Sequence, residues 1–505
     1  MGSPQSRIEP VVEKKLTERL QALEVKENRK DLEKGYVYID DEKPSGYKPY
    51  SPTVSISTAE EWERQLMEDP KNRLALSALS SNDPKTILQQ RSATIADVHS
   101  FNIKIPFEGA PITNQRSSGR CWLFAATNVF RVTIMKRHNL KEFELSQAYL
   151  FFWDKLEKAN YFLEQIVDTA KEDLEGRVVQ QLLSSPVGDG GQWDMVANLV
   201  EKYGLVPQSL YPDSFNAMNS RTMGAIITTK LREDALKLRR LAAKSIDAKY
   251  TLGAEKEKML REIHLILTLM LGPPPNPKKK FTWEYYDSNG KFHSVETTPL
   301  KFAAELSSSE SLRANSGTDV HELFSLVNDP RNKYGELLTV SRLGNVIGMR
   351  GITYINVDMN TMKQACISML KAGHPIFFGS DVGQFSNRTG IMDTNLIDYE
   401  LGFNITLGLS KAQRLMTGES AMTHAMVLTA VQLDEKTGKS VRWRVQNSWG
   451  TEAGVDGWFV MSDAWMDEFV YQAVIDPRFV SKEIRSILDK EPVVLPPWDP
   501  MGALA

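Results

Sequence analysis

The chain has 505 residues, enough for two or three domains or for one large fold with insertions. Hydrophobic residues make up 41% of it and charged residues 25%, which is usual for a globular protein that buries a core. The formal net charge of −3 argues against a nucleic-acid-binding surface that covers the whole protein, and the presence of only two cysteines argues against a disulfide scaffold.

The N-terminal residues carry no recognisable export signal. No apolar run in the sequence approaches the roughly 18 residues of a membrane span, and the stretch MGSPQSRIEPVVEKK has no apolar core and contains two glutamates. We therefore expect a cytoplasmic protein without stable membrane association. Met1-Gly2 followed by Ser6 fits the N-myristoylation pattern, but a polar tail is the simpler interpretation, because a single acyl chain holds a protein only weakly on a membrane.

The first part of the chain differs in composition from the rest. Residues 1–60 are polar and charge-dense, and we expect a partly disordered extension with one helix at 16–34. A further helix is expected to begin near Thr58, where Ser57 and Glu60 have the spacing of a capping box.

Helical patterns dominate the middle of the sequence and strand patterns its later part. Two helical patterns, at 121–139 and 145–183, are followed by two amphipathic ones, at 231–249 and 255–271, and by a strand pattern at 281–287. Further short strand patterns lie at 353–357, 375–381, 425–433, 441–449 and 457–462. A helical half that precedes a strand-rich half, with a helical insert between them, predicts an α+β fold.

Cys121 lies where the polar loop NQRSSGR turns into an apolar helical pattern. A cysteine is a nucleophile only as the thiolate, and the first turn of a helix favours that form through its unpaired N–H groups. We therefore expect an exposed, activated sulfur at this helix start. Gln115, six positions upstream, can direct its amide to the same place and form an oxyanion hole with the main-chain N–H of Cys121. The other cysteine, Cys366, has apolar neighbours in a helical pattern and is assigned to packing.

A catalytic cysteine also needs a base and a group that orients it. Among seven histidines, His424 stands out because it opens the strand pattern MTHAMVLTAV directly after a loop. In the strand pattern 441–446 apolar residues alternate with polar ones, so Asn447 should continue the inward-facing row. Asn447 can then accept the imidazole N–H, while Trp449 shields that bond from water.

These stretches together resemble a papain-type cysteine peptidase: NQRSSGRCW around Cys121, MTHA around His424 and QNSWG around Asn447. Gly190 and Gly191, in VGDGGQW, match the paired glycines along which such enzymes hold the substrate backbone. Within that superfamily the sequence is most similar to the bleomycin hydrolase (aminopeptidase C) family. The motifs shared with it include SQAYLFFWDK, FTWEYYD, LVNDPRNKYG, GESAMTHAM and the final WDPMGALA.

The resemblance implies two papain-like halves, a helical insert domain, an N-terminal hook and a C-terminal arm that lies in the active-site cleft, assembled as a homohexamer. The 302 residues between Cys121 and His424 leave room for such an insert, since compact papain-like enzymes have roughly 130–150. The implied division is 1–60 as the extension, 61–100 as the hook, 101–205 as the helical half with the cysteine, 206–338 as the helical insert, 339–490 as the strand-rich half with the histidine and asparagine, and 491–505 as the arm.

The resemblance also implies an activity. The protein is expected to be a cysteine aminopeptidase that removes N-terminal residues from peptides with a free N-terminus, and bleomycin and homocysteine thiolactone are implied as further substrates. The catalytic residues would be Cys121, His424, Asn447 and Gln115. Gly190, Gly191, Trp449 and Ala505 would bind substrate, the carboxylate of Ala505 receiving the substrate's amine. No cofactor and no metal ion are expected.

Two other functions stay open at this point. The first is a thiol enzyme of different specificity, an endopeptidase or an acyltransferase. The second is a non-catalytic hexameric scaffold that binds nucleic acid or partner proteins. The candidate nucleic-acid site is the run Lys278-Lys279-Lys280 beside Phe281 and Trp283. A solvated loop is the simpler interpretation of that run, given the net acidity of the chain. The resemblance also implies that the hexamer encloses a central channel, and weak nucleic-acid binding there is retained as an expectation only.

Overall fold

The computed structural model describes residues 52–243 and 248–504. The chain divides into two compact units, Met1–Leu74 and Ala75–Ala505, which are described separately. The helix expected at 16–34, the possible acylation site Gly2 and the terminal Ala505 lie outside the described residues. Within the described ranges, no helix is both long enough and apolar enough to cross a membrane.

The first unit contains helix α2 (Ile56–Glu68). The expected helix is present, but its start differs from the prediction. Ser55 is the N-cap, and its hydroxyl accepts the main-chain N–H of Thr58 at 3.1 Å. The capping box predicted at Ser57 and Glu60 is therefore wrong by two positions, because Ser55 has the same capping chemistry and comes first in the chain.

The helical half of the second unit is built on α6 (Cys121–His138), α7 (Gln147–Asp168) and α9 (Trp193–Tyr203). Every residue of α6 from Cys121 to Met135 is buried, including the polar or charged Thr127, Asn128, Arg131 and Thr133. The helix predicted over 145–183 is interrupted: α7 ends at Asp168, and α8 (Arg177–Ser184) begins after a turn that Gly176 closes by donating to the carbonyl of Asp173 at 3.0 Å.

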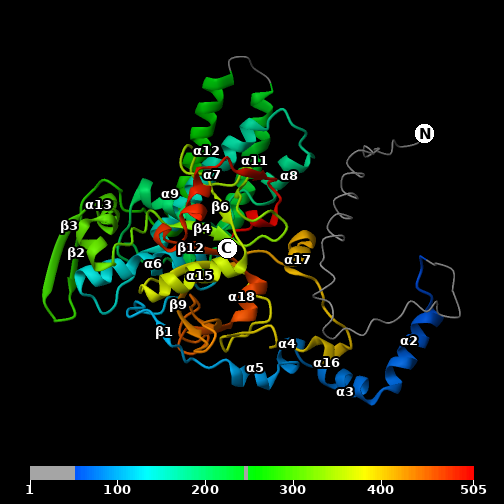
Figure 1. Ribbon diagram of the computed structural model, residues 1–505. Coiled ribbons are helices and arrows are strands. Elements are labelled where there is room, and N and C mark those ends of the chain that lie inside the picture. Colours follow the sequence, from blue (N-terminus) through cyan, green and yellow to red (C-terminus); the bar gives the residue numbers. More distant parts are fainter. Residues whose placement is uncertain (1–51, 244–247, 505) are drawn as a thin grey trace, which may run out of the picture. The chain divides into compact units, whose positions relative to one another are not determined.

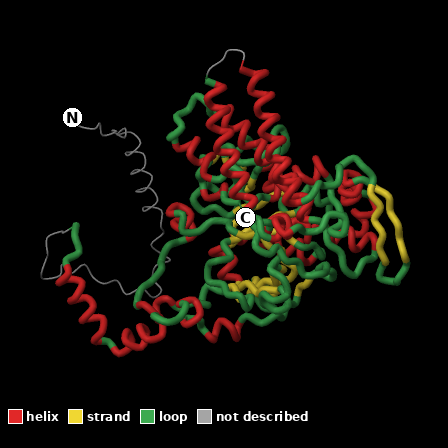
Figure 2. The backbone as a smooth tube through the Cα atoms, turned by 180° about the vertical axis from the view of Figure 1, so that it is seen from behind, coloured by secondary structure: helices red, strands yellow, loops and turns green. Residues whose placement is uncertain are grey.

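The predicted insert contains a helix pair and a hairpin. Helices α11 (Arg221–Ala242) and α12 (Ala248–Leu271) pack against each other and against α7 (Figure 1). Strands β2 (Phe281–Tyr286) and β3 (Phe292–Thr297) pair only with each other, and Figure 2 shows this hairpin apart from the other strands. The division into domains made from the sequence stays a prediction.

Within the described residues eleven strands form one sheet, in the order β13-β5-β6-β4-β12-β7-β9-β10-β11-β8, and β1 also pairs with β9. Their bounds are β1 (Ile103–Lys104), β4 (Phe324–Val327), β5 (Leu337–Val340), β6 (Tyr354–Asn356), β7 (Ile376–Ser380), β8 (Ile391–Met392), β9 (His424–Leu433), β10 (Ser440–Gln446), β11 (Trp458–Ser462), β12 (Val470–Ile475) and β13 (Val493–Leu495). With its helical half and this largely antiparallel sheet, the molecule has the predicted α+β architecture.

Strand β9 joins the two halves of the fold. Its first eight residues are buried, since β7 and β10 flank it and α6 packs against it. The alternation predicted for β10 holds only in part: Trp443 and Val445 are buried, but Val441 is 43% exposed and Gln446 is buried. Ser440 pairs with Leu433 and Arg442 with Gln432, so Val441 is an extra, unpaired residue of β10, which explains its exposure.

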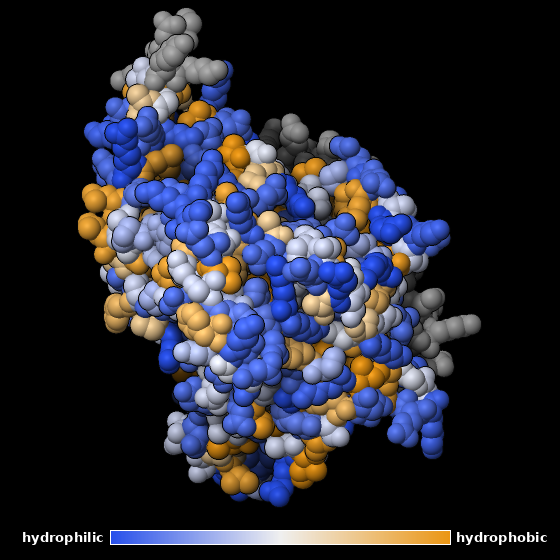
Figure 3. Space-filling model, turned by 90° about the vertical axis from the view of Figure 1, so that its left-hand side faces the viewer, coloured by the Kyte–Doolittle hydropathy of each residue, from blue (hydrophilic) through white to orange (hydrophobic). Residues whose placement is uncertain are grey.

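The remaining elements are helices of at most 13 residues. They are α3 (Pro70–Leu79), α4 (Pro84–Ile87), α5 (Arg91–Ala96), α10 (Phe215–Met218), α13 (Pro299–Ala304), η1 (Glu305–Ser307), α14 (Ser309–Ala314), α15 (Met359–Lys371), α16 (Tyr399–Phe403), α17 (Lys411–Thr417), α18 (Asp463–Phe469), η2 (Pro477–Phe479), α19 (Lys482–Arg485), η3 (Ser486–Asp489) and η4 (Pro500–Gly502). On the face shown in Figure 3, hydrophobic residues are interspersed with polar ones, as is usual for a protein surface.

Candidate active site

Cys121 is the first residue of α6, with Arg120 at the N-cap, as the sequence predicted. Its environment differs from the prediction, because the residue is only 2% exposed. Burial raises the pKa of the Cys121 thiol to about 11, against the opposing effect of the main-chain N–H groups of Ala425 and Trp122. Because the N–H of Ala425 acts on the sulfur, the sulfur lies beside the start of β9. The raised pKa favours the thiol form until a base accepts its proton.

His424, at the start of β9, is hydrogen-bonded to Asn447: Nε2 of the imidazole lies 2.8 Å from Oδ1 of the amide. The main-chain N–H of Ser448 also donates to this Oδ1, at 2.8 Å, which identifies the atom as the amide oxygen. Because an amide oxygen can only accept, Nε2 carries the hydrogen and Nδ1 is left as the basic nitrogen. Burial lowers the pKa of His424 to about 4, despite the opposing effect of Asn447, so the ring is uncharged at neutral pH.

Trp449 covers this pair. Its ring centroid lies 4.9 Å from that of His424, and Phe459 packs edge-on against the indole with a centroid distance of 5.7 Å. His424 and Asn447 are 5% and 1% exposed. The shielding role predicted for Trp449 is consistent with this contact.

Gln115 lies in the loop before α6 and is tied to the asparagine segment. Its side-chain Oε1 accepts from the hydroxyl of Ser448 at 2.7 Å, and its main-chain N–H donates to the Ser448 carbonyl at 2.8 Å. Its Nε2 donates to the carbonyl of Ser118 at 2.7 Å, which uses one of the two hydrogens of that nitrogen. The structure thus brings the loop of Cys121 together with the segment that orients His424.

Gly191, the second residue of the glycine pair, packs against Trp122, the residue that follows Cys121 in the chain. A methyl group built on Gly191 would lie 2.5 Å from ring atoms of Trp122, so the backbone there packs directly on that indole. The indole Nε1 donates to the main-chain oxygen of Asp189 at 2.8 Å. The position next to Cys121 and the glycine loop are therefore held in one arrangement.

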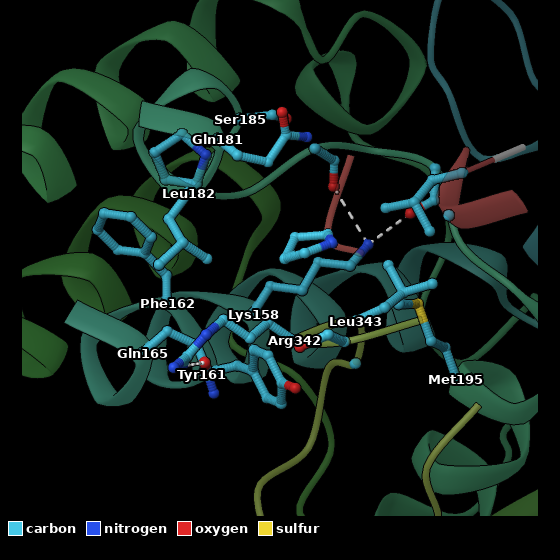
Figure 4. A pocket seen from close by; sticks show the side chains of 18 residues that line it. Lys158, Tyr161, Phe162, Gln165, Gln181, Leu182, Ser185, Met195, Arg342 and Leu343 are labelled. Carbon is cyan, nitrogen blue, oxygen red and sulfur yellow. Dashed lines mark hydrogen bonds between the residues drawn. The ribbon is translucent and has the colours of Figure 1, made fainter. Parts of the chain in front are cut away.

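Sequence reasoning missed a buried ionic network under this loop. Lys155 donates to the carbonyl of Val187 at 2.8 Å and pairs with the carboxylate of Asp189. Lys158 donates to the carbonyl of Gly190 at 2.6 Å (Figure 4) and pairs with Asp154 at 2.6 Å. Both lysines are nearly fully buried. The sequence signal for this network is the stretch DKLEK at 154–158, which places four charged residues inside an apolar helical pattern.

Asp189 links this network to the loop before Cys121. Its Oδ2 accepts the main-chain N–H of Gly119 at 3.1 Å and the hydroxyl of Ser220. Although burial by itself raises the pKa of Asp189, Lys155, Ser220 and the Gly119 N–H together hold it at about 2. Asp189 is therefore charged at neutral pH and accepts hydrogen bonds from Gly119, in the loop before Cys121, and from Ser220.

A second missed group holds the loop before His424. The buried carboxylate of Asp381 accepts from the hydroxyl of Ser420 at 2.8 Å and from that of Thr423 at 3.1 Å. The main-chain N–H of Thr423 donates to the carbonyl of Ser380 at 3.0 Å. Asp381 therefore fixes the residue that immediately precedes the histidine.

The C-terminal segment lies beside the glycine pair. The carbonyl of Ala503 accepts a hydrogen bond from Nε2 of Gln192 at 2.5 Å. Leu504 and Gly190 both line a cavity of about 410 Å³ between α7, α8 and residues 341–344 (Figure 4). The described part of the arm thus reaches the glycine loop, while Ala505 lies outside the described residues.

Other residues singled out in the sequence lie in different surroundings. Cys366 is fully buried on α15 among apolar residues, as predicted for a packing cysteine. Lys278, Lys279 and Lys280 are exposed, and Lys280 pairs with Glu296 at 2.6 Å. Nucleic-acid binding by this run stays a prediction.

A thiol at a helix start, an imidazole held by an amide oxygen and a glycine loop packed beside the thiol's helix are typical of cysteine peptidases with a papain-like α+β fold. Comparison with known proteins supports this class. Residues 53–502 match the model of the Peptidase C1-like family, and the chain belongs to that family.

The similarity to two relatives and to a solved structure extends over most of the chain. It is 43% identical over 467 residues to "Cysteine proteinase 1, mitochondrial" of Saccharomyces cerevisiae, covering 91% of this chain and 94% of the relative. It is 42% identical over 450 residues to "Bleomycin hydrolase" of Homo sapiens, covering 88% and 96%. The crystal structure of PepW from Lactobacillus rhamnosis superposes with a TM-score of 0.84 at 41% identity, covering 90% of this chain and 100% of that one. The protein is a cysteine peptidase.

Proposed function

We propose that this cysteine peptidase is an aminopeptidase that removes N-terminal residues from peptides through an acyl-enzyme on Cys121. Nδ1 of His424 accepts the thiol proton while the sulfur attacks the carbonyl carbon of the first peptide bond. Because burial keeps both groups uncharged, proton transfer and attack are coupled. The observation that carries this assignment is the hydrogen bond from His424 to Asn447, which leaves Nδ1 as the base.

The later steps of the proposed reaction use Gln115, Cys121 and His424. The tetrahedral oxyanion accepts hydrogen bonds from the Cys121 main-chain N–H and from the second Nε2 hydrogen of Gln115. His424 returns its proton to the leaving amine, and the C–N bond breaks to leave a thioester. The imidazole then removes a proton from water, whose oxygen attacks the thioester and releases the N-terminal amino acid while Cys121 regains its proton.

Specificity for a free N-terminus is attributed to the C-terminal arm. Gly190 and Gly191 hold the substrate backbone, and the arm lies beside this loop through the Gln192–Ala503 hydrogen bond. A carboxylate at the end of the arm, at Ala505, would pair with the substrate's α-ammonium group and leave no room for a longer chain. Bleomycin and homocysteine thiolactone are proposed as further substrates, the first because relatives carry the name bleomycin hydrolase.

The test compares a leucyl fluorogenic amide with a free amine and its N-acetylated form. Wild type should cleave only the free amine, Cys121→Ala should cleave neither, and a variant that lacks Leu504 and Ala505 should gain activity on the acetylated substrate. Equal cleavage of both by wild type would contradict the aminopeptidase assignment. The homohexamer, the cytoplasmic location and nucleic-acid binding stay predictions from the sequence.

A further inference from the structure

Gln192 directly follows the glycine pair and occupies the N-cap position of α9, yet its side chain does not cap that helix. The residue is fully buried, and its Nε2 donates to the main-chain oxygen of Ala503 at 2.5 Å. Its Oε1 has no hydrogen-bond partner among the described residues. The side chain of Gln192 thus makes one hydrogen bond, the one to the arm, and neither caps α9 nor pairs its own oxygen among the described residues.

We infer that Gln192 is a specificity-determining residue: its amide fixes the end of the C-terminal arm at a set position relative to the substrate-binding glycines. This inference rests on the proposed aminopeptidase function. In that reaction the arm excludes blocked substrates only if the distance from its end to the sulfur is constant. Gln192 would set this distance without contacting the reacting atoms, so it is a positioning residue.

A short series of contacts connects the arm to the nucleophile through Gln192. Trp122 follows Cys121 in the chain, Gly191 packs directly on the Trp122 ring, and Gln192 follows Gly191. Trp193, the next residue, is 1% exposed and anchors α9 in the core. Displacement of the arm relative to the sulfur would therefore require either a break in the Gln192–Ala503 bond or movement of packed core residues.

The other polar contacts of the arm are farther from its end. Asp499 pairs with Arg331 at 2.8 Å, and the carbonyl of Met501 accepts from the hydroxyl of Tyr354 at 3.3 Å. Strand β13 pairs with β5 farther back still. These contacts keep the arm attached to the body when the Gln192 amide is lost, so we expect its last residues to shift without release of the whole arm.

Three variants test the inference. Gln192→Met removes the amide at nearly constant volume, Gln192→Glu places a carboxylate against the Ala503 carbonyl, and Gln208→Met changes a partly buried glutamine outside the site as a control. The readouts are kcat and KM for the free-amine and N-acetylated leucyl amides, the rate of Cys121 alkylation by iodoacetamide, and Tm.

For Gln192→Met, kcat/KM on the free amine should fall roughly 10- to 100-fold, mostly through KM, because the amine partner is displaced by about an ångström. Cleavage of the acetylated amide should rise, Gln192→Glu should show the larger loss, and Cys121 alkylation should stay within about twofold of wild type. The control should match wild type.

Unchanged selectivity in both Gln192 variants, with wild-type alkylation, would overturn the role of Gln192 while leaving the aminopeptidase function intact. Equal cleavage of both amides by wild type would instead overturn the proposed function, and this inference with it. If Gln192→Met does not fold, selectivity of Gln192→Glu decides the question, because that change keeps side-chain length and polarity.

Discussion

The main-chain N–H of Gly119 donates to Oδ2 of Asp189 at 3.1 Å, so one partly buried carboxylate holds both the loop that leads into Cys121 and the loop that carries Gly190. Both cysteines in the described structure are free thiols, and the ionic network joins these loops without a disulfide. The geometry of the Cys121 loop and that of the backbone proposed to bind substrate are therefore coupled through a charge.

Asp189→Asn should reduce both activity and stability, because it leaves Lys155 buried without its carboxylate partner. Loss of one partner of a buried ion pair costs about 3–5 kcal/mol. Thermal unfolding and kcat for the leucyl amide check this. Asp168→Asn is the control: Asp168 pairs with Arg342 from a side chain that is 64% exposed, and such pairs contribute about 0–1 kcal/mol. Equal effects of the two changes would contradict the coupling role of Asp189.

Asn447→Asp should move the acid limb of the pH–rate profile to higher pH. A carboxylate favours the protonated imidazole, so the pKa of His424 would rise from its lowered value of about 4, and the ring would be charged over a wider range at low pH. Because the base must be unprotonated, activity should be lost at higher pH than in wild type. The measurement is kcat/KM between pH 4 and 8. An acid limb that stays in place would show that Asn447 does not contact the catalytic imidazole.

Gly191→Ala should weaken substrate binding through a steric effect. The new methyl group would lie 2.5 Å from the Trp122 ring, and overpacking of this kind costs about 1–3 kcal/mol. We expect a higher KM for the leucyl amide and a lower Tm. Gly224→Ala is the matched control, since Gly224 lies inside α11 with open space around it, and the change should stabilise the helix by about 1 kcal/mol. A Gly191→Ala variant with wild-type KM and Tm would refute the packing argument.

Asp97→Asn should remove a pH dependence of stability. Burial and the neighbouring Asp393 raise the pKa of Asp97 to about 7, from an ordinary value of 3.8, while Arg442 opposes the shift. Between these two values the folded state holds a proton that the unfolded state has released. The free energy of unfolding contributed by this group therefore falls as pH rises through that window.

Thermal unfolding of wild type and Asp97→Asn at pH 4 to 8 measures this effect. The two proteins should be similar near pH 4, and the variant should be the more stable at pH 8, because asparagine carries no charge beside Asp393. A constant difference in Tm across this range would contradict the raised pKa.

Local pattern was enough to predict the positions of the main groups. The switch from polar loop to apolar helix at Cys121, the strand start at His424 and the position of Asn447 after β10 all follow from residue periodicity within one element. The α+β class followed in the same way from the order of the elements.

The features that were not predicted depend on contacts between distant residues. Lys155 meets Asp189 across more than thirty positions, and no single-element pattern shows that a helical lysine points inward at a loop carbonyl. The exposure predicted for the Cys121 sulfur is wrong because the residue is only 2% exposed, and the effect of this burial on the thiol pKa outweighs that of the nearby main-chain N–H groups. The break after Asp168 was missed because the apolar period resumes in α8.

The most direct measurement follows the products from an unmodified decapeptide by mass spectrometry over time, with Cys121→Ala as the blank. The aminopeptidase account predicts a ladder of fragments that lose one residue after another from the N-terminus, and no change in the blank. Internal fragments that appear before the N-terminal residue is released would contradict it.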